Sequence, residues 1–336
     1  MSSLTDHTRR RWPFRRTRKI LGVVAITALG LTFASTGANA FLEQQERSST
    51  AQYGELVEVA GGSLNVVRAG TEGGQPLVLL SGLGTIAPGL DFAPLIRELA
   101  AYDVIVVERF GYGYSDMSAP DRTVENISAE LHEALSSLDI GKPYVLAGHS
   151  IAGFYTLDYA NRYPGEVSAV IGIDPSVPAT QSAAGGGINI IGILSTVGLV
   201  RTVVSLAPDE VVPKSDDFTT TELERMRQMT MWDYGNAAVA DESNRVASNA
   251  AALQGVTYPE NIPVLHFLAS DSIAKFPDWL ESHKNQLTNV NRHEIVELQG
   301  PHNLQWTQST AMAKKITHFL RDIDGNGQPE DKEQSF

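Results

Sequence analysis

The apolar positions of the chain form short continuous runs that alternate with stretches of helical periodicity. Runs of this kind are typical of strands in a parallel sheet, because helices bury both faces of such a sheet. Two runs on either side of Gly61-Gly62 predict an opening hairpin. Together these patterns predict an α/β fold with a doubly wound, mostly parallel sheet. The predicted strands are residues 56–59, 63–68, 76–81, 104–108, 144–148, 169–174, 264–269 and 294–298, and the predicted helices are residues 92–100, 124–138, 151–163 and 309–323.

The alternation of strands and helices stops once, between the sixth and seventh predicted strands. Residues 176–256 contain mainly helical patterns, so we expect them to form a helical cap inserted between core residues 41–175 and 257–322. Part of this cap, residues 188–207, carries a single charge, on Arg201. The pattern favours a buried helix pair there. The alternatives are a lid whose apolar side contacts lipid or an apolar substrate, and a membrane span.

Residues 1–40 differ from the rest of the chain in charge. They contain seven of the 26 basic residues but only one of the 39 acidic residues. The basic segment precedes an apolar run at residues 20–33 and the small residues Ala38-Asn39-Ala40, which is the order found in a secretory signal peptide. A retained membrane anchor is the alternative, since residues 20–40 carry no charge and about 20 residues span a bilayer; a cytosolic amphiphilic tail is a third.

Either of the first two interpretations has a consequence for location. The basic end of an N-terminal apolar segment stays in the cytoplasm, so the part of the chain that follows is exported. We therefore expect a protein that is secreted, or anchored on the outer face of the cytoplasmic membrane.

Composition excludes several classes of function. The net charge of −13 argues against a nucleic-acid-binding protein, which needs a basic face against the phosphates. The chain has no cysteine, so disulfides, a cysteine nucleophile and cysteine-ligated zinc are excluded.

The clearest chemical motif is Gly148-His149-Ser150-Ile151-Ala152-Gly153, which follows a predicted strand and opens a predicted helix. A serine on such a tight turn has an exposed, strained geometry, and the helix N-terminus behind it favours negative charge on an attacked carbonyl oxygen. Ala152 occupies a position where glycine is usual, and it is small enough for the turn to form. We therefore expect Ser150 to be a nucleophile; the alternative is a serine that only caps the helix.

Several segments make residues 52–320 similar to the α/β-hydrolase-fold family. Ser81 departs from the family's pattern because it stands where the family carries the histidine of its oxyanion loop. We expect this change to alter hydrogen bonds of the loop without removing the backbone donor. Glu108 replaces an aspartate, a change that we expect to be structural. The segments that carry the resemblance are residues 81–84, residues 108–115 (E-R-F-G-Y-G-Y-S), the turn at Ser150 and Gly300-Pro301-His302.

The resemblance implies a serine hydrolase whose nucleophile, acid and base follow one another in the order Ser, Asp, His. His302 is then the general base, because it follows a strand and precedes the last helix; a solvent-exposed loop histidine is the alternative. Asp271, after the seventh predicted strand, is the expected acid, and Asp174, at the end of the sixth, is the alternative acid. The implied oxyanion donors are the backbone N–H groups of Leu83 and Ile151.

The activity that we expect is cleavage of a small-molecule carboxylic ester with an apolar acyl group, through an acyl-enzyme intermediate and without a cofactor. Peptidase, lactonase, thioesterase and C–C hydrolase activities remain open. A serine nucleophile disfavours the haloalkane dehalogenases and epoxide hydrolases of this fold, which attack with aspartate. A hydrolase-fold binding or sensing protein with little turnover is the alternative from another class. The expected partners are the ester and, through the N-terminus, a membrane, but no nucleic acid.

The C-terminal residues 323–336 predict an acidic tail, and the spacing of side chains at its start fits an EF-hand calcium loop. Pro329 stands where that loop normally has a hydrophobic residue with a backbone N–H, and no exit helix follows. A tail without a metal is therefore the favoured interpretation, and calcium binding is the alternative. The residues that fit the loop are Asp322, Asp324, Asn326 and Glu333.

Overall fold

The structure, a computed structural model, describes residues 14–138, 140–178, 189–323 and 325. Within these residues one sheet contains the strands β1 (Glu55–Val59), β2 (Gly62–Gly70), β3 (Pro76–Leu80), β4 (Asp103–Glu108), β5 (Tyr144–His149), β6 (Val167–Ile173), β7 (Val264–Ala269) and β8 (His293–Leu298). Their order across the sheet is β1-β2-β4-β3-β5-β6-β7-β8. β2 is antiparallel to both of its neighbours, and the other neighbouring pairs are parallel. The predicted α/β fold with a mostly parallel sheet is confirmed.

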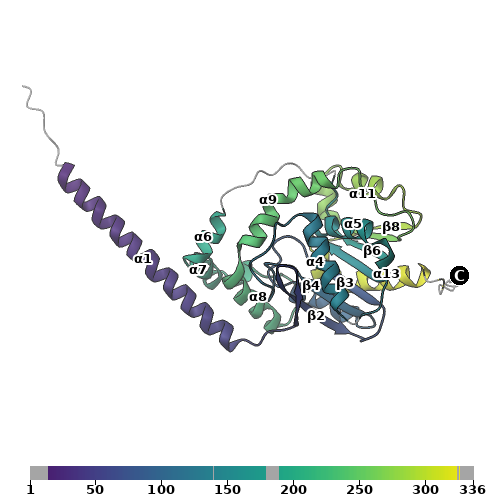
Figure 1. The fold of residues 1–336 in the computed structure, drawn as a ribbon, viewed down its shortest axis with the longest axis horizontal. Helices are drawn as coiled ribbons and strands as arrows, with labels where there is room; N and C mark the ends of the chain where they lie inside the picture. Colours follow the sequence, from purple (N-terminus) through teal and green to yellow (C-terminus); the bar gives the residue numbers. More distant parts are fainter. Residues whose placement is uncertain (1–13, 139, 179–188, 324, 326–336) are drawn as a thin grey trace, which may run out of the picture.

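Helices cover both faces of this sheet (Figure 1). In β3, Val78 packs in the cluster formed with α4 and α5, while its neighbour Leu77 packs in the cluster formed with α3 and α13. Both side chains are fully buried. Because successive side chains of a strand point in opposite directions, a strand covered on both faces is apolar throughout, which explains the continuous runs. The helices of the core are α2 (Pro88–Asp91), α3 (Ala93–Glu98), α4 (Val124–Ser137), α5 (Ala152–Arg162), α10 (Ser270–Lys275), α11 (Trp279–Leu287), α12 (Leu304–Thr307) and α13 (Ser309–Ile323), with a 3-10 turn at Pro164–Glu166.

Between β6 and β7 the described chain is helical and forms the cap. Thr219 and Glu222 make a capping box at the start of its third helix, and Asn236 accepts a hydrogen bond from the N–H of Val239 at the start of its fourth. The helices of the cap are α6 (Ile190–Thr196), α7 (Leu199–Leu206), α8 (Thr220–Asp233) and α9 (Ala237–Ala252), with a 3-10 turn at Pro208–Glu210.

α6 and α7 form a hairpin that differs from the buried helix pair favoured by the sequence. The hairpin turns at Gly198, whose φ is 79°. Val204 is buried, but several large apolar side chains are 37–82% exposed. An apolar segment predicts helices that pack against something, but the buried face depends on neighbours far along the chain. The exposed side chains are Ile193, Leu194, Leu199, Val203 and Leu206.

α1 (Phe14–Ser49) is a single helix that passes beside the α6–α7 hairpin and projects away from the folded domain (Figure 1). Among the described residues, its part Ile20–Ser49 is the one helix that is long and apolar enough to cross a membrane, by length and composition. Residues 50–54 connect it to β1. Such a helix is compatible with a signal peptide or with an anchor, and by itself it does not show export.

Of the four residues that fit a calcium loop, Asp322 is described. It lies in α13, with its carboxylate 4.0 Å from the guanidinium of Arg292. Asp324, Asn326 and Glu333 lie outside the described residues. Within the described ones, no three His, Asp or Glu side chains are placed to hold a metal ion.

Candidate active site

Ser150 lies on a sharp turn between β5 and α5, at the carboxyl edge of the sheet. Its φ of 55° is in the left-handed region, which is strained for a residue with a side chain. Two hydrogen bonds hold the turn, from Ser150 N–H to Ile173 O (3.1 Å) and from Ser176 N–H to Ser150 O (2.7 Å). A Cβ on Gly148 would lie 2.9 Å from Ala152 O, so glycine is needed there. Ala152 is buried at the start of α5, and the turn forms with alanine in place of the usual glycine.

His302 connects Ser150 to a carboxylate. Its Nε2 lies 2.8 Å from Oγ of Ser150, and its Nδ1 lies 2.6 Å from Oδ2 of Asp174. These residues follow β8, β5 and β6, so the parallel strands bring three distant side chains to one edge of the sheet. The two hydrogen bonds form a continuous path from hydroxyl to carboxylate, which is the arrangement that lets a serine lose its proton to a histidine.

Four donors surround the carboxylate of Asp174, which is fully buried. Oδ1 accepts from Ala269 N–H (3.1 Å) and Trp279 Nε1–H (2.9 Å), and Oδ2 accepts from the Ser272 hydroxyl and from His302. Burial alone would raise the pKa of Asp174, but the hydrogen bonds from His302 and Ser272 outweigh it and lower that pKa below its ordinary value. The carboxylate is therefore ionised at neutral pH and holds His302 in one orientation.

Asp271, the acid expected from the sequence, does not lie beside His302. It is in the first turn of α10, where its side chain is exposed and its N–H donates to Gly300 O at 3.3 Å. The expectation that Asp271 orients His302 is corrected, because Asp174, the alternative acid, occupies that place. The physical reason is that the chain enters a helix directly after β7. This helix turns Asp271 outward and turns Ser272 toward Asp174.

The loop after β3 lies against the turn at Ser150. A Cβ on Gly82 would be 2.9 Å from His149 Nδ1 and 3.1 Å from Ser150 Cβ, so this contact requires glycine. Within the part of the chain that the structure describes, the backbone N–H groups of Leu83 and Ile151 donate no hydrogen bond to the protein. Ile151 follows Ser150 directly, and Leu83 follows Gly82, so both expected oxyanion donors belong to segments that meet at Ser150.

His149 is buried beside His302. The centroids of the two rings are 4.8 Å apart, and Nε2 of His149 lies 3.3 Å from the main-chain oxygen of His302. Burial, reinforced by the proximity of His302, lowers the pKa of His149 to about 3. His149 is thus neutral at neutral pH, and it supports the loop of His302 without adding a charge next to Ser150.

Arg109, Tyr112 and Glu242 connect the cap to the loop after β3. Arg109 donates to Ser81 O (2.9 Å) and to Oε1 of Glu242 (2.9 Å). The hydroxyl of Tyr112 donates to Oε2 of Glu242 (2.8 Å) and accepts from Gly84 N–H (3.1 Å). Burial disfavours the charge on Arg109, but Glu242 outweighs it and raises the pKa of the guanidinium. A cap helix, α9, therefore fixes the loop that carries one of the candidate oxyanion donors.

The sequence does not predict this connection. Arg109 and Tyr112 stand in the motif at residues 108–115, but Glu242 lies far along the chain in the cap. An acidic residue in a predicted cap helix is by itself no signal, since it is costly only where it is buried without a cation. Nothing in the sequence tells that such a residue is buried.

A cavity of about 830 Å³ lies between the core and the cap. One end adjoins the candidate catalytic residues, because Leu83, Pro301 and Asn303 line it. Apolar side chains of the cap line the other end. A cavity of this size and character suits a small ligand with an extended apolar part. The lining residues from α6, α7 and α8 include Leu194, Leu199, Val200, Val203, Val204 and Met226.

Asp91 is a buried carboxyl group on the core side of this cavity. It accepts hydrogen bonds from Gln305 Nε2 (2.9 Å) and Trp306 Nε1 (2.8 Å). Burial raises its pKa to about 6, because neither partner carries a compensating positive charge. This group therefore titrates close to neutral pH.

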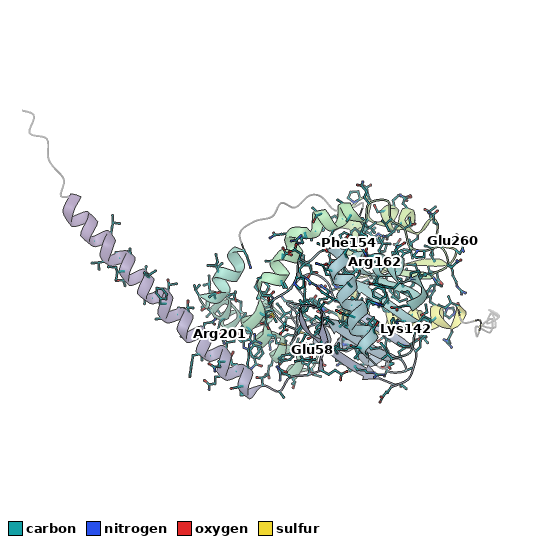
Figure 2. The ribbon with its side chains drawn as sticks, in the orientation of Figure 1. Glu58, Lys142, Phe154, Arg162, Arg201 and Glu260 are labelled. Atoms are coloured by element: carbon teal, nitrogen blue, oxygen red, sulfur yellow. The ribbon has the colours of Figure 1, made fainter. Side chains whose placement is uncertain are left out.

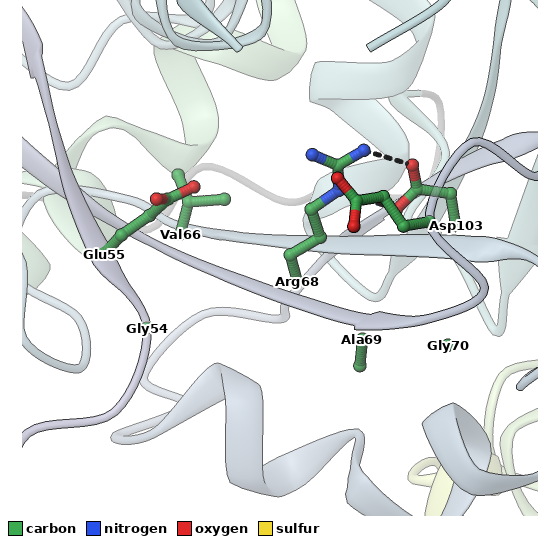
Figure 3. Close-up of a pocket in the computed structure, with 8 residues that line it drawn as sticks. Gly54, Glu55, Val66, Arg68, Ala69, Gly70 and Asp103 are labelled. Atoms are coloured by element: carbon green, nitrogen blue, oxygen red, sulfur yellow. Dashed lines mark hydrogen bonds and ion pairs between the residues drawn. The ribbon is translucent and has the colours of Figure 1, made fainter. Parts of the chain in front are cut away.

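A second cavity, of about 480 Å³, lies beside β1, β2 and the first residue of β4 (Figure 3). This position is at the amino end of β4, whereas Ser150 and Asp174 lie at the carboxyl ends of their strands. Arg68 donates two hydrogen bonds to Asp103 there, at 2.9 and 2.6 Å. The bond from Arg68 lowers the pKa of Asp103. This cavity lies away from Ser150 and His302, so we place the candidate site at the other cavity.

Comparison with known proteins identifies the fold. A model of the α/β hydrolase fold family matches residues 75–190, which include Ser150. Epoxide hydrolase A from Mycobacterium thermoresistibile aligns with a TM-score of 0.60 and 18% identity, over 81% of this chain and 98% of that one. A thermophilic esterase from Thermogutta terrifontis aligns with a TM-score of 0.58 and 18% identity, over 80% and 99%. The chain has the α/β-hydrolase fold, and its residues 75–190 match that superfamily.

The chain is also similar in sequence to known proteins. It is 27% identical to Uncharacterized protein YbdG from Bacillus subtilis (strain 168), over 80% of this chain and 86% of that protein. It is 26% identical to Lipase 1 from Psychrobacter immobilis, over 46% of this chain and 48% of the lipase. The match thus spans about half the length of the lipase. A hydrolase activity is supported at this level, and both a lipase and an epoxide hydrolase are among the similar proteins.

Proposed function

We propose that this α/β hydrolase cleaves carboxylic esters, with Ser150 as nucleophile, His302 as general base and Asp174 as the acid that orients His302. The observation that carries the proposal is the pair of hydrogen bonds on His302, 2.8 Å to Ser150 Oγ and 2.6 Å to Asp174 Oδ2. A general base must lie within hydrogen-bond reach of the proton that it takes, and Nε2 meets this condition.

In the first step Oγ of Ser150 attacks the carbonyl carbon of the ester, and its proton passes to Nε2 of His302. Oδ2 of Asp174 accepts a hydrogen bond from Nδ1–H of the ring, so that Nε2 presents its lone pair to the serine. The ionised carboxylate also stabilises the imidazolium that forms. The low pKa of Asp174 supports this role, since it keeps the group charged throughout.

The carbonyl oxygen becomes an oxyanion in this step, and the N–H groups of Leu83 and Ile151 would donate to it. When the tetrahedral intermediate collapses, His302 returns its proton to the alcohol that leaves. The acyl group then stays on Ser150 as an ester. A water molecule then gives a proton to His302 as its oxygen attacks the acyl carbon. When this second tetrahedral intermediate collapses, the bond to Oγ breaks, His302 returns the proton to Oγ of Ser150, and the carboxylic acid leaves.

Two observations favour an ester with an apolar acyl group. The cavity between the core and the cap has aliphatic side chains of the cap, among them Leu199 and Val203, along one side. A serine nucleophile also separates this chain from the epoxide hydrolases with the same fold, which it resembles in structure but which use aspartate. The lipases among its relatives agree with this choice of bond.

A fluorophosphonate probe, which reacts with an activated serine, tests the proposal. We expect it to label the full-length wild-type protein and the variant Ser248→Ala, which changes an exposed serine of the cap. Ser150→Ala should lose the label, and it should also lose hydrolysis of nitrophenyl esters. Absence of labelling in well-folded wild-type protein would overturn the proposal in favour of a binding or sensing protein.

A further inference from the structure

α1 contains a segment with the dimensions of a membrane span. Residues 20–42 include no charged side chain. At 1.5 Å per residue this segment extends for roughly 34 Å, against a hydrocarbon core of about 30 Å. Its eight large apolar side chains from Ile20 to Phe33 are 58–72% exposed, so the folded domain does not cover them.

The end of this segment is docked on the cap. Ser35 donates to Val197 O (2.6 Å), at the turn of the α6–α7 hairpin. Asn39 is only 8% exposed, and its Oδ1 accepts from Nε of Arg201 (2.9 Å). Arg201 also donates to Glu46 (2.6 Å), one α1 turn beyond the uncharged segment. Figure 2 shows Arg201 beside α1, and it is the only charged residue at positions 190–207.

The docking continues to the end of the helix. Arg47 forms an ion pair with Asp233 (2.6 Å), and its guanidinium lies 4.6 Å from the ring centroid of Trp232. The indole of Trp232 donates to Glu46 (2.7 Å). α1 is thus bound to the cap on both sides of Ala40, the residue after which a signal peptidase would cut.

This arrangement argues against cleavage. Proteolysis favours exposed segments without regular hydrogen bonding, whereas Ala38-Asn39-Ala40 lies inside a continuous helix with Asn39 buried. A cut after Ala40 would separate Asn39 from the rest of the chain and remove one of the two polar partners of Arg201 on α1.

The α6–α7 hairpin joins this helix to the cavity. Leu194, Leu199 and Val203 line the cavity, and they are also 37–51% exposed on the outer surface. They therefore form an apolar rim at its mouth. Ile193 and Leu206 extend the exposed apolar surface beyond the rim. Soluble proteins rarely expose so many neighbouring aliphatic side chains, and such patches mark contacts with partners or membranes.

We propose that α1 is retained as a membrane anchor and that the α6–α7 hairpin enters the same bilayer beside it, so that the cavity opens onto lipid. The hairpin turn contacts Ser35 and Asn39, near the C-terminal end of the uncharged segment. The hairpin therefore lies level with one leaflet. The basic residues before Ile20 assign the other end of the span to the cytoplasm, so this leaflet is the outer one.

The surface fits a bilayer better than a protein partner for two reasons. It is continuous with a helix whose exposed apolar length matches a bilayer, and its only charge, Arg201, is turned inward to α1. Where the proposed ester hydrolase function also holds, the substrate is an apolar ester that moves from the leaflet past Leu199 and Val203 into the cavity. The membrane contact itself does not depend on that function.

The first measurement is the mass of the full-length protein purified from membranes. We expect a chain that still contains residues 20–40 and resists extraction with alkaline carbonate. A mature chain that begins at Phe41 would overturn the proposal.

The second measurement detects lipid at the hairpin without using activity. Since the chain has no cysteine, Ile193→Cys gives a single site for an environment-sensitive fluorophore. Phe276→Cys is the matched control, because Phe276 is similarly exposed but lies outside the cap, directly after α10. In phosphatidylcholine vesicles with quencher-labelled acyl chains, we expect quenching at residue 193 and little at residue 276. Equal quenching at both, or quenching at residue 193 by a second labelled copy and not by lipid, would contradict the proposal.

The third measurement compares hydrolysis of an ester held in vesicles with hydrolysis of an ester dissolved in water. Ile193→Gln/Leu206→Gln changes exposed side chains that do not line the cavity. We expect its activity on a long-chain ester in vesicles to fall about tenfold, since each apolar side chain contributes to insertion. Activity on a dissolved short ester should stay unchanged, and Leu56→Gln/Phe276→Gln should resemble the wild type in both assays. Equal loss on both esters would contradict the proposal, whereas no activity in any variant would count against the hydrolase function and leave the first two readouts decisive.

Discussion

The carboxyl edge of the sheet and the α6–α7 hairpin differ in what they bury: the first buries polar groups, and the second exposes apolar ones. At the sheet edge the carboxylate of Asp174 is fully buried and accepts hydrogen bonds from four donors. The strands β5, β6 and β7 that end there have no large apolar side chain exposed to solvent. In the hairpin, aliphatic side chains face outward, and the one charge depends on α1 for its partners. The difference separates two tasks: the core fixes the atoms that make and break bonds, and the hairpin governs what reaches them.

This division gives a criterion for experiments. A change at the sheet edge should alter the rate with every ester, whatever its form. A change at the cavity or the hairpin should depend on the length of the acyl chain or on its presentation.

The largest effect is expected from the acid at the sheet edge. Asp174→Asn keeps the shape of the side chain but loses the charge that fixes His302, and we expect kcat to fall by about 10⁴-fold. Asp271→Asn, the matched control on an exposed position, should leave kcat nearly unchanged. Steady-state kinetics on one soluble ester, with thermal melts to confirm folding, compares the two. A larger loss in Asp271→Asn would reverse the assignment of the acid.

Asp91 gives the next effect, on stability. Its pKa is raised to about 6, so the neutral form favours the folded state at low pH, and this contribution is lost as pH rises through about 6. A rise of about two pKa units corresponds to roughly 3 kcal/mol. Relative to Asp91→Asn, the wild type should therefore lose up to about that much unfolding free energy between pH 4 and pH 8. Urea unfolding of both proteins across this range measures the difference; parallel pH profiles would show that Asp91 keeps an ordinary pKa.

Glu242 tests whether the cap also contributes to the rate. Glu242→Gln weakens the bonds to Arg109 and Tyr112, and thereby loosens the loop with the candidate oxyanion donor Leu83. We expect kcat to fall about tenfold with KM little changed, less than the loss of a whole oxyanion donor. The control is Glu130→Gln, which breaks a buried pair with Arg122 in the core but does not touch that loop. If both variants lose stability and neither loses kcat, Glu242 has a structural role only.

The smallest effect is expected from the length of the acyl chain. Each methylene that enters the apolar cavity contributes about 0.8 kcal/mol, which corresponds to a rise in kcat/KM of up to about fourfold. The rise should stop when the cavity is full, and Val200→Phe, which narrows it, should move this limit to a shorter chain. A panel of nitrophenyl esters measures the dependence. A flat response would show that acyl chains bind elsewhere.

The sheet could be predicted from the sequence because burial on both faces leaves a strong local signal. Every expected strand is present, with bounds shifted by at most two residues at either end. The turn at Ser150 could also be predicted, since its geometry depends on small residues next to one another in the chain.

The acid could not be chosen from the sequence. Asp174 and Asp271 each stand at the end of one of two neighbouring strands, and local pattern treats them alike. What separates them is the set of donors from Ala269, Ser272 and Trp279, which come from a later part of the chain. The exposure of the α6–α7 hairpin could not be predicted for a similar reason. Which of its side chains are covered depends on the path of α1, which is far away along the chain.

The short connection between α1 and β1 limits how the protein can move if α1 spans a membrane. Residues 50–54 reach at most about 18 Å even when fully extended. The reactive serine would then keep a nearly constant height above the leaflet, and lateral diffusion in two dimensions would supply its substrate. Its working rate would follow the surface density of the ester in the leaflet and not the concentration in the surrounding solution.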